Sequence, residues 1–292
     1  MHKSLSLMLG KMKSKWILKF FIFLFLVVRA ESMVNVPFDV SMQSVVANYQ
    51  YNPNDARWQF LKSLYEKYQN EFSLSDQYVI PKWIHFIWLG SPLPSRCEAM
   101  VDTWKKYHPD WTIKVWTEED LSSFDFINRI AFDRAQNYAE KSDIWRYEIL
   151  NQFGGMYVDT DFECLQSFDE LHRSCEFYLG IGQHKNPELL NSIIGSRADH
   201  PILKALIKNV PIGPGDNDSW RILRDTGPYF LTQIFFDVAP TCLPSTIVTF
   251  PTTFFFPFPG YHRQRQDKEN IKREFVKPES MAIHYFAASW QL

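Results

Sequence analysis

The sequence carries almost no net charge, few cysteines and no internal repeat. Its 31 Lys and Arg residues nearly balance its 33 Asp and Glu residues, for a formal net charge of −2. A nucleic-acid partner is therefore not indicated. The four cysteines (Cys97, Cys164, Cys175 and Cys242) follow no zinc-binding spacing. They fit either disulfides in an exported chain, with Cys164–Cys175 as a candidate, or buried thiols.

The sequence also lacks an uninterrupted apolar run long enough for a comfortable membrane span of roughly 20 residues. The apolar stretch Phe20–Val28 follows several lysines and is followed by Ala30. This pattern fits a signal peptide that is cleaved after Ala30, and it fits an uncleaved amino-terminal membrane anchor equally well. In either case residues 1–30 are excluded from the fold, and membrane association would occur through them.

Aromatic residues, in contrast, make up 16% of the chain. This content excludes a disordered chain and permits a large core. Residues 31–79 form a lead-in with one predicted helix at 58–72. Beyond it the patterns predict strands at 80–90 and 111–116 and helices at 98–108 and from 117 onward. This alternation indicates an α/β domain over residues 80–292 that begins with a nucleotide-binding half.

The second half of the chain is less regular. The patterns predict a strand at 177–182, helices at 189–194, 201–210 and 229–236, and a loop at 211–219. The segment 250–261 is so rich in proline and phenylalanine that a regular central strand is excluded, and its rings are expected to lie under a loop. The basic segment 262–277 is expected to be a solvated excursion.

The most informative stretch is residues 141–161. A helix is predicted to end at Gly154-Gly155, and the short apolar strand 156–158 is followed by Asp159 and Asp161. Because alternate residues of an extended chain point the same way, the two carboxylates form a hard oxygen site that suits Mg²⁺ or Mn²⁺ carrying phosphate oxygens. Asp143 and Arg146 share one face of the preceding helix, as either a buried ion pair or a ligand clamp.

These residues resemble a known family. The pattern Ser142-Asp143-Ile144-x-Arg146, then Leu150, then Gly154-Gly155-x-Tyr157-x-Asp159-x-Asp161 is similar to that of the DXD-motif glycosyltransferases. Within them it most resembles the fungal initiating mannosyltransferases, the inositol-phosphoceramide mannosyltransferases and the bacterial capsule-type sugar transferases. The strand at 80–90 and the segment 280–290 also resemble this family. The resemblance implies a single GT-A-type α/β domain with a mixed, mainly parallel sheet flanked by helices.

The resemblance also implies roles for individual residues. Asp159 and Asp161 would hold a divalent metal, Mn²⁺ or Mg²⁺, and His284 would complete its shell. His284 occupies the first position of the family's closing His-His-x-x-x-Ser-Trp segment, whereas Tyr285 departs from the second. The nucleotide-sugar donor would contact the side chains of Trp88, at the base, Asp143 and Arg146, at hydroxyls and diphosphate, and Ser289 and Trp290, which would close over the diphosphate. Asn191 and the turn at Thr226 are further candidates.

The implied function is a metal-dependent glycosyltransferase. It would move a hexose from GDP-mannose or a UDP-sugar to a glycan, lipid or protein acceptor, with retention of configuration as in the family, in the secretory pathway, at a Golgi-type membrane, or exported to a bacterial envelope. A phosphotransferase of the haloacid dehalogenase type is a weaker fit, because Phe162-Glu163 replaces the Thr or Val expected after its Asp-x-Asp. A non-catalytic glycan- or partner-binding protein that kept the fold remains the alternative.

Overall fold

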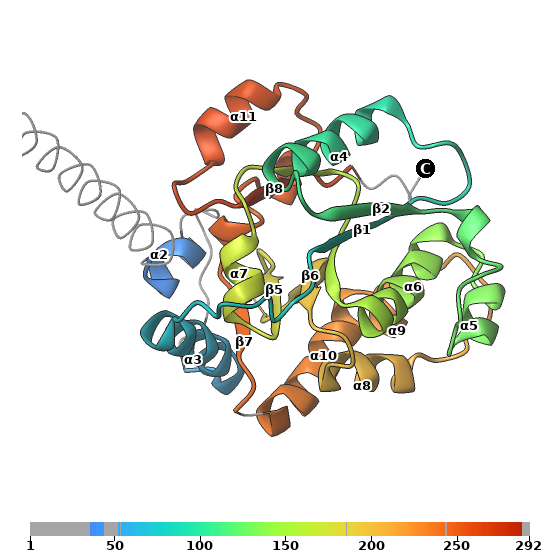
Figure 1. The fold of residues 1–292 in the computed structure, drawn as a ribbon, viewed down its shortest axis with the longest axis horizontal. Helices are drawn as coiled ribbons and strands as arrows, with labels where there is room; N and C mark the ends of the chain where they lie inside the picture. Colours follow the sequence, from blue (N-terminus) through green and yellow to red (C-terminus); the bar gives the residue numbers. More distant parts are fainter. Residues whose placement is uncertain (1–35, 44–51, 53, 185, 243, 288–292) are drawn as a thin grey trace, which may run out of the picture. The chain divides into compact units, whose positions relative to one another are not determined.

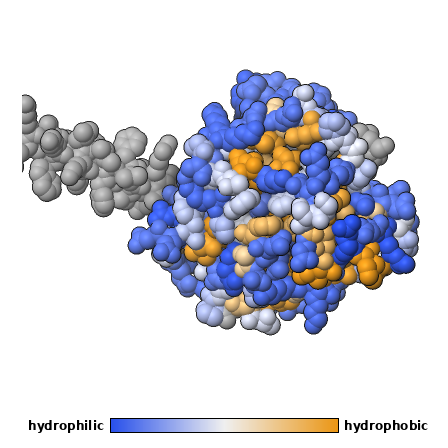
Figure 2. Space-filling view, turned by 45° about the vertical axis from the view of Figure 1, so that its right-hand side comes forward, coloured by the Kyte–Doolittle hydropathy of each residue, from blue (hydrophilic) through white to orange (hydrophobic). Residues whose placement is uncertain are grey.

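The computed structural model describes residues 36–287 except 44–51, 53, 185 and 243 (Figure 1). The predicted signal peptide or anchor, at 1–30, and Ser289 and Trp290 lie outside the described residues. The described residues from 38 onward form one compact unit, and the face of it in Figure 2 is largely hydrophilic with several hydrophobic patches. Within the described ranges, no helix has both the length and the apolar character needed to cross a membrane.

A six-stranded sheet runs through the centre of this unit. Its strands follow the order β2-β1-β3-β6-β5-β7. β6 is antiparallel to both of its neighbours, while every other pairing is parallel. The predicted α/β class with a mixed, mainly parallel sheet is therefore confirmed. The strands are β1 (Trp83–Ile87), β2 (Thr112–Trp116), β3 (Gly155–Val158), β5 (Phe177–Ile181), β6 (Leu189–Ser196) and β7 (Ile247–Phe250).

Helices flank the sheet on both sides (Figure 1). α6 packs against β1, β3 and β6, α10 packs against β6, and α3 packs against β7. The helices are α2 (Phe38–Gln43), α3 (Ala56–Glu71), α4 (Ser95–Tyr107), α5 (Arg129–Arg134), α6 (Tyr138–Phe153), α7 (Asp169–Ser174), α8 (Pro201–Asn209), α9 (Ser219–Asp225), α10 (Pro228–Val238) and α11 (Lys268–Phe275), with short 3₁₀ turns at Glu118–Asp120, Ala239–Cys242, Thr252–Phe254 and Gly260–His262.

A second, two-stranded sheet joins distant parts of the chain. β4 (Phe162–Cys164) directly follows the Asp-x-Asp pair and is antiparallel to β8 (Ala282–His284). In this register Phe162 is opposite His284, and the two rings stack with centroids 4.3 Å apart. The backbone N–H of Tyr285 donates to the Asp161 carbonyl (3.1 Å). The small sheet thereby brings the segment around His284 to the carboxyl end of β3.

The sequence-based prediction for residues 189–194 was wrong. These residues form the strand β6 and not a helix. The strand lies between β3 and β5 and is almost completely buried on both faces, so the alternation of apolar and polar residues that marks a half-exposed strand is missing. Two adjacent β-branched residues, Ile193 and Ile194, favour the extended conformation.

Two predictions about the later segments had different outcomes. The phenylalanine rings of the segment 250–261 are buried as expected (Phe250, Phe254, Phe255, Phe256 and Phe258), whereas Tyr261 at its end is exposed. The segment 262–277 is not a simple solvated excursion, because it forms α11 and buries Ile271 against Phe258 and Ile283. All four cysteines are free thiols, so Cys164–Cys175 is not a disulfide, and the thiols of Cys97, Cys164 and Cys175 are buried, whereas Cys242 is only partly buried.

Candidate active site

Two glycines set the position of the acid pair. Gly154 (φ 63°) ends α6 and Gly155 (φ 95°) begins β3, both in the backbone region that favours glycine. A Cβ atom on Gly155 would lie 2.7 Å from the carbonyl oxygen of Trp83, so β3 could not approach β1 as closely with another residue there. After this tight turn come the four buried residues of β3, and Asp159 follows them directly, at the edge of the sheet where the strand ends.

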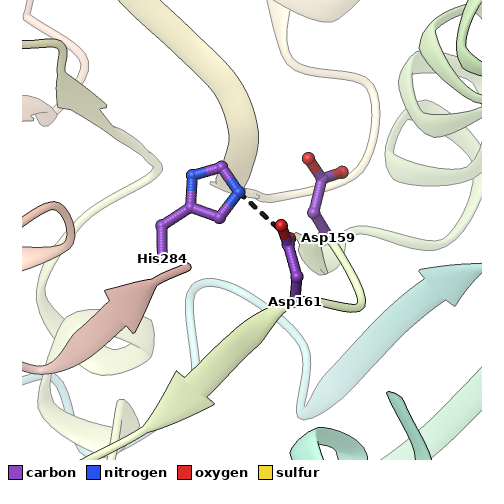
Figure 3. Close-up of side chains that lie close together, drawn as sticks. All are labelled: Asp159, Asp161 and His284. Carbon is purple, nitrogen blue, oxygen red and sulfur yellow. Dashed lines mark hydrogen bonds and ion pairs between the residues drawn. The ribbon is translucent and has the colours of Figure 1, made fainter. Parts of the chain in front are cut away.

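Asp159, Asp161 and His284 lie together at this edge (Figure 3). One ligand atom from each of the three residues falls within 4.8 Å of those of the other two. The imidazole Nε2 of His284 is 3.0 Å from Asp161 Oδ1, and the backbone N–H of Ala287 donates to Asp161 Oδ2 (2.7 Å). Burial acts to raise the pKa of Asp161, but the charge and hydrogen bond of His284 and the Ala287 N–H outweigh it, and the pKa is lowered.

Arg146 connects this group to α6. Its guanidinium is 3.0 Å from Asp143 Oδ1 and 3.3 Å from Asp159 Oδ1, and it donates to the Asn191 carbonyl (2.8 Å). It also lies over the ring of Tyr157, 4.3 Å from the centroid. With only 5% of its side chain exposed, Arg146 is a buried cation that holds two carboxylates from two different elements in fixed positions.

Both oxygens of the Asp143 carboxylate accept hydrogen bonds in addition to the ion pair with Arg146. Asn191 Nδ2 donates to Oδ1 (2.8 Å), and the Thr226 hydroxyl donates to Oδ2 (3.2 Å). Burial raises the pKa of Asp143 to about 6, against the opposing effect of Arg146. For Asp159, burial likewise raises the pKa, with Arg146 lowering it and the neighbouring Asp161 raising it further. Asp143 and Asp159 thus share the Arg146 guanidinium, and with Asp161 close to Asp159 an excess of negative charge remains at this edge.

These side chains line a pocket of about 700 Å³. Trp88 lies on its wall just beyond β1, half-buried, with its indole N–H donating to the Ser91 hydroxyl (3.2 Å). The volume is in the range of small-molecule and cofactor sites. The pocket thus brings together six of the eight predicted site residues (Trp88, Asp143, Arg146, Asp159, Asp161 and His284).

The residues present fit a divalent metal ion. The donor set is two carboxylates and one imidazole, which Mn²⁺ and Mg²⁺ sites accept, with the carboxylates as the preferred ligands of Mg²⁺. A cation would also offset the excess negative charge of Asp143, Asp159 and Asp161 described above. In addition, Nδ1 of His284 is buried and makes no hydrogen bond to any described residue, so this imidazole is not fully used by the fold itself.

Several pocket residues were not predicted from the sequence. The hydroxyl of Tyr157 donates a hydrogen bond to Asp159 Oδ1 (2.7 Å). The sequence could have suggested this contact, because residues two apart in a strand point to the same side. Glu188 and Phe286 also line the pocket, as does Arg263, from the segment expected to be a solvated excursion. No local sequence pattern identifies Glu188, Phe286 or Arg263 as pocket residues, because the tertiary fold alone brings each of them to the pocket.

Comparison with known proteins supports the predicted relationship. Residues 94–178, which include both aspartates, match the family described as glycosyltransferase sugar-binding region containing DXD motif. Inositol phosphoceramide mannosyltransferase 3 of Schizosaccharomyces pombe is 26% identical over 176 residues, 58% of this chain and 48% of the relative. Mannosyl phosphorylinositol ceramide synthase CSH1 of Saccharomyces cerevisiae is 26% identical over 177 residues, 58% of this chain and 46% of the relative.

Among solved structures, the PaToxG glycosyltransferase superposes with a TM-score of 0.45 at 18% identity, covering 63% of this chain and 80% of that one. The chain spans about half the length of the two mannosyltransferase relatives. The resemblance drawn from the sequence is confirmed: residues 94–178 match the DXD-motif glycosyltransferase region, and the chain is similar to an inositol phosphoceramide mannosyltransferase.

Proposed function

We propose that this protein is a metal-dependent glycosyltransferase that moves a hexose from a nucleotide-diphosphate sugar to a hydroxyl-bearing acceptor. The observation that carries the proposal is the convergence of Asp159, Asp161 and His284 in a pocket that also holds the buried Asp143–Arg146 pair. The relation to DXD-motif glycosyltransferases supports it.

In this proposal Asp159, Asp161 and His284 hold the metal ion. When bound, the metal supplies charge compensation for the diphosphate leaving group. Tyr157 and Arg146 fix Asp159 in the orientation that its ligand role requires.

Asp143 accepts hydrogen bonds from hydroxyls of the donor. Asn191 and Thr226 hold its carboxylate in place, so the donor meets a fixed acceptor group and not one that must reorganise. Trp88 packs near the base, and Ser289 and Trp290 close over the diphosphate.

The donor sugar, the anomeric configuration of the product and the cellular location are proposed from the relatives and the family resemblance. One relative is named a mannosyltransferase and another a mannosyl phosphorylinositol ceramide synthase, so GDP-mannose is the first donor to test, followed by UDP-sugars. Retention of anomeric configuration is proposed from the family resemblance. It is tested by the NMR signal of the anomeric proton of the product. Residence in the secretory pathway, or export, is proposed with it and is tested by the location of the tagged full chain.

The test is nucleotide release by the purified full chain. It is incubated with GDP-mannose and with a panel of UDP-sugars, in the presence of Mn²⁺ or of a chelator. We expect release that depends on the metal and that falls by about 100-fold or more in Asp159→Asn/Asp161→Asn, the loss typical of removing a major electrostatic contributor. Asp102→Asn, at an exposed aspartate of α4, is the matched control and should leave the rate unchanged.

The possible outcomes separate the alternatives. Metal-dependent release that is lost only in the double variant supports the transferase. A folded wild-type protein that binds sugar nucleotides without turning them over would favour a binding protein. Activity that survives in the double variant would refute the assigned metal site.

A further inference from the structure

One carboxylate of the pocket has no role in the proposed metal and donor contacts. Glu188 lines the pocket, and only 8% of its side chain is exposed. Among the described residues its partner is the Nε2 atom of His184, 3.2 Å away, on a side chain that is itself 60% exposed. A carboxylate offers about four lone-pair positions, and buried ones are normally hydrogen-bonded. Glu188 therefore retains acceptor capacity that faces the pocket.

The strand order fixes where Glu188 lies. Trp88 follows β1, Asp159 follows β3, and Glu188 directly precedes β6, which is antiparallel to β3. Because β3 separates β1 from β6, Trp88 and Glu188 lie on opposite sides of the acid pair. The Asp159 N–H bonds to the carbonyl of Ser192, so Glu188 is four residues, roughly 13 Å, farther along the strand. A sugar attached to the diphosphate would lie nearer to Asp159 than this.

Two exposed aromatic side chains line the same pocket as Glu188. Trp220 of α9 is 71% exposed and Tyr229 of α10 is 40% exposed, and both line the pocket. Burial and the nearby charge of Glu188 raise the pKa of Tyr229. The position of α9 is fixed, because Arg221 donates two hydrogen bonds, of 2.7 and 2.9 Å, to the buried Glu140 of α6. The aromatic rings are thus presented by rigid elements.

This combination selects a particular ligand chemistry. Aromatic faces pack against the C–H surface of a ring, and a carboxylate accepts hydrogen bonds from its hydroxyls. An anionic group would be repelled by Glu188, and an alkyl chain would leave the buried carboxylate unsatisfied. Burial raises the pKa of Glu188 to about 7, and both its ionised and its protonated form can accept hydrogen bonds from ring hydroxyls.

We propose that Glu188, Trp220 and Tyr229 form an acceptor subsite for a neutral sugar ring. The inference rests on the proposed transferase function and narrows its acceptor to a carbohydrate. Glu188 accepts hydrogen bonds from ring hydroxyls, while Trp220 and Tyr229 pack against the ring.

The first test is binding, which does not require activity. Saturation-transfer difference NMR is recorded on the full chain with methyl α-mannoside, methyl β-glucoside and methyl β-galactoside. We expect at least one glycoside to receive saturation from the wild type, and Glu188→Ala and Trp220→Ala to lose it. Glu119→Ala and Tyr107→Ala, at exposed positions outside the pocket, should keep it. No binding by the wild type, or equal binding by all variants, would overturn the subsite.

The second test is kinetic and uses the donor identified by nucleotide release. In Glu188→Ala the KM for the glycoside acceptor should rise by about tenfold or more, the size expected for losing one hydrogen bond to a charged group, and by more than the KM for the donor. A larger effect on the donor KM would assign Glu188 to the donor sugar and overturn the proposal. If the wild type uses no sugar nucleotide at all, the proposed function fails, while the NMR result still decides the subsite.

Discussion

Replacing Arg146 by methionine removes the cation at the centre of the site. Arg146 has side-chain contacts with Asp143 and Asp159 and donates to backbone carbonyls of Ser142 and Asn191. Methionine keeps much of the length of the side chain and none of its charge. The variant would therefore leave two buried carboxylates without their cation, which is the situation in which a broken buried ion pair is most destabilising.

Breaking such a pair costs about 3–5 kcal/mol. For a chain of this size each kcal/mol lowers Tm by about 2–4 °C, so we expect a fall of roughly 6–20 °C. The deficit should depend on pH. The pKa of Asp143 is already raised from 3.8 to about 6 in the folded protein, so its ionisation destabilises the fold as pH rises between these values. Without Arg146 this pKa rises further, and the loss becomes larger at about pH 8 than at about pH 5.

The assay is thermal and urea unfolding of the full chain at both pH values, in chelator so that no metal substitutes for the guanidinium. Arg57→Met, at an exposed arginine, is the matched control. The double variant Asp143→Asn/Arg146→Met should recover part of the loss, because one unpaired carboxylate is then removed. A Tm within about 2 °C of wild type at both pH values, or strict additivity in the double variant, would refute the electrostatic argument.

Three further substitutions test other parts of the structure. His284→Ala should weaken Mn²⁺ binding by about tenfold or more in calorimetry, because it removes both a ligand and the hydrogen-bond partner of Asp161. Asp143→Asn should abolish the fall in unfolding free energy that its ionisation causes between about pH 4 and 6, measured by urea titration at a series of pH values. Gly195→Ala would place a Cβ 2.0 Å from the ring of the buried Tyr178 and should lower the unfolding free energy by about 1–3 kcal/mol or more.

Two of these substitutions have a matched control elsewhere in the chain. His262→Ala removes an imidazole that is not part of the metal cluster and should leave Mn²⁺ affinity unchanged. Gly260→Ala meets its nearest neighbour at 3.5 Å and should be tolerated. Unchanged metal affinity in His284→Ala would remove that residue from the ligand set. A persisting pH slope in Asp143→Asn would assign the slope to another group, and a stable Gly195→Ala would show that the sheet can move away from Tyr178.

The local parts of the site could be predicted from the sequence. A helix that ends at two glycines, a short buried strand and two carboxylates after it are all encoded within residues 138–161, where hydrophobic period and glycine placement act over a few residues. The same holds for α4, β1 and β2. In these segments the local pattern and the final fold agree, so the sequence and the structure lead to the same element boundaries within a few residues.

The parts that failed depend on contacts between distant residues. β6 resembles a helix in sequence because burial on both faces removes its alternation, and only its position between β3 and β5 makes it a strand. Arg263 and Glu188 sit in segments without any diagnostic period, and the path of the chain alone brings them to the pocket. His284 was predicted through the family resemblance. Its pairing with Asp161 across 123 residues could not have been derived from spacing.

The β4–β8 sheet has a consequence for the order in which the site assembles. Asp159 and Asp161 are fixed by local structure, whereas His284 joins them only when β8 docks on β4. A ligand that bridges Asp161 and His284 therefore joins residues that are 123 positions apart in the sequence, and it stabilises the docked state through its own binding free energy. Ligand binding then favours the docking of β8 on β4, and this docking in turn raises the affinity for the ligand. A weakened β4–β8 pairing would appear as weaker ligand binding even with every ligand atom intact.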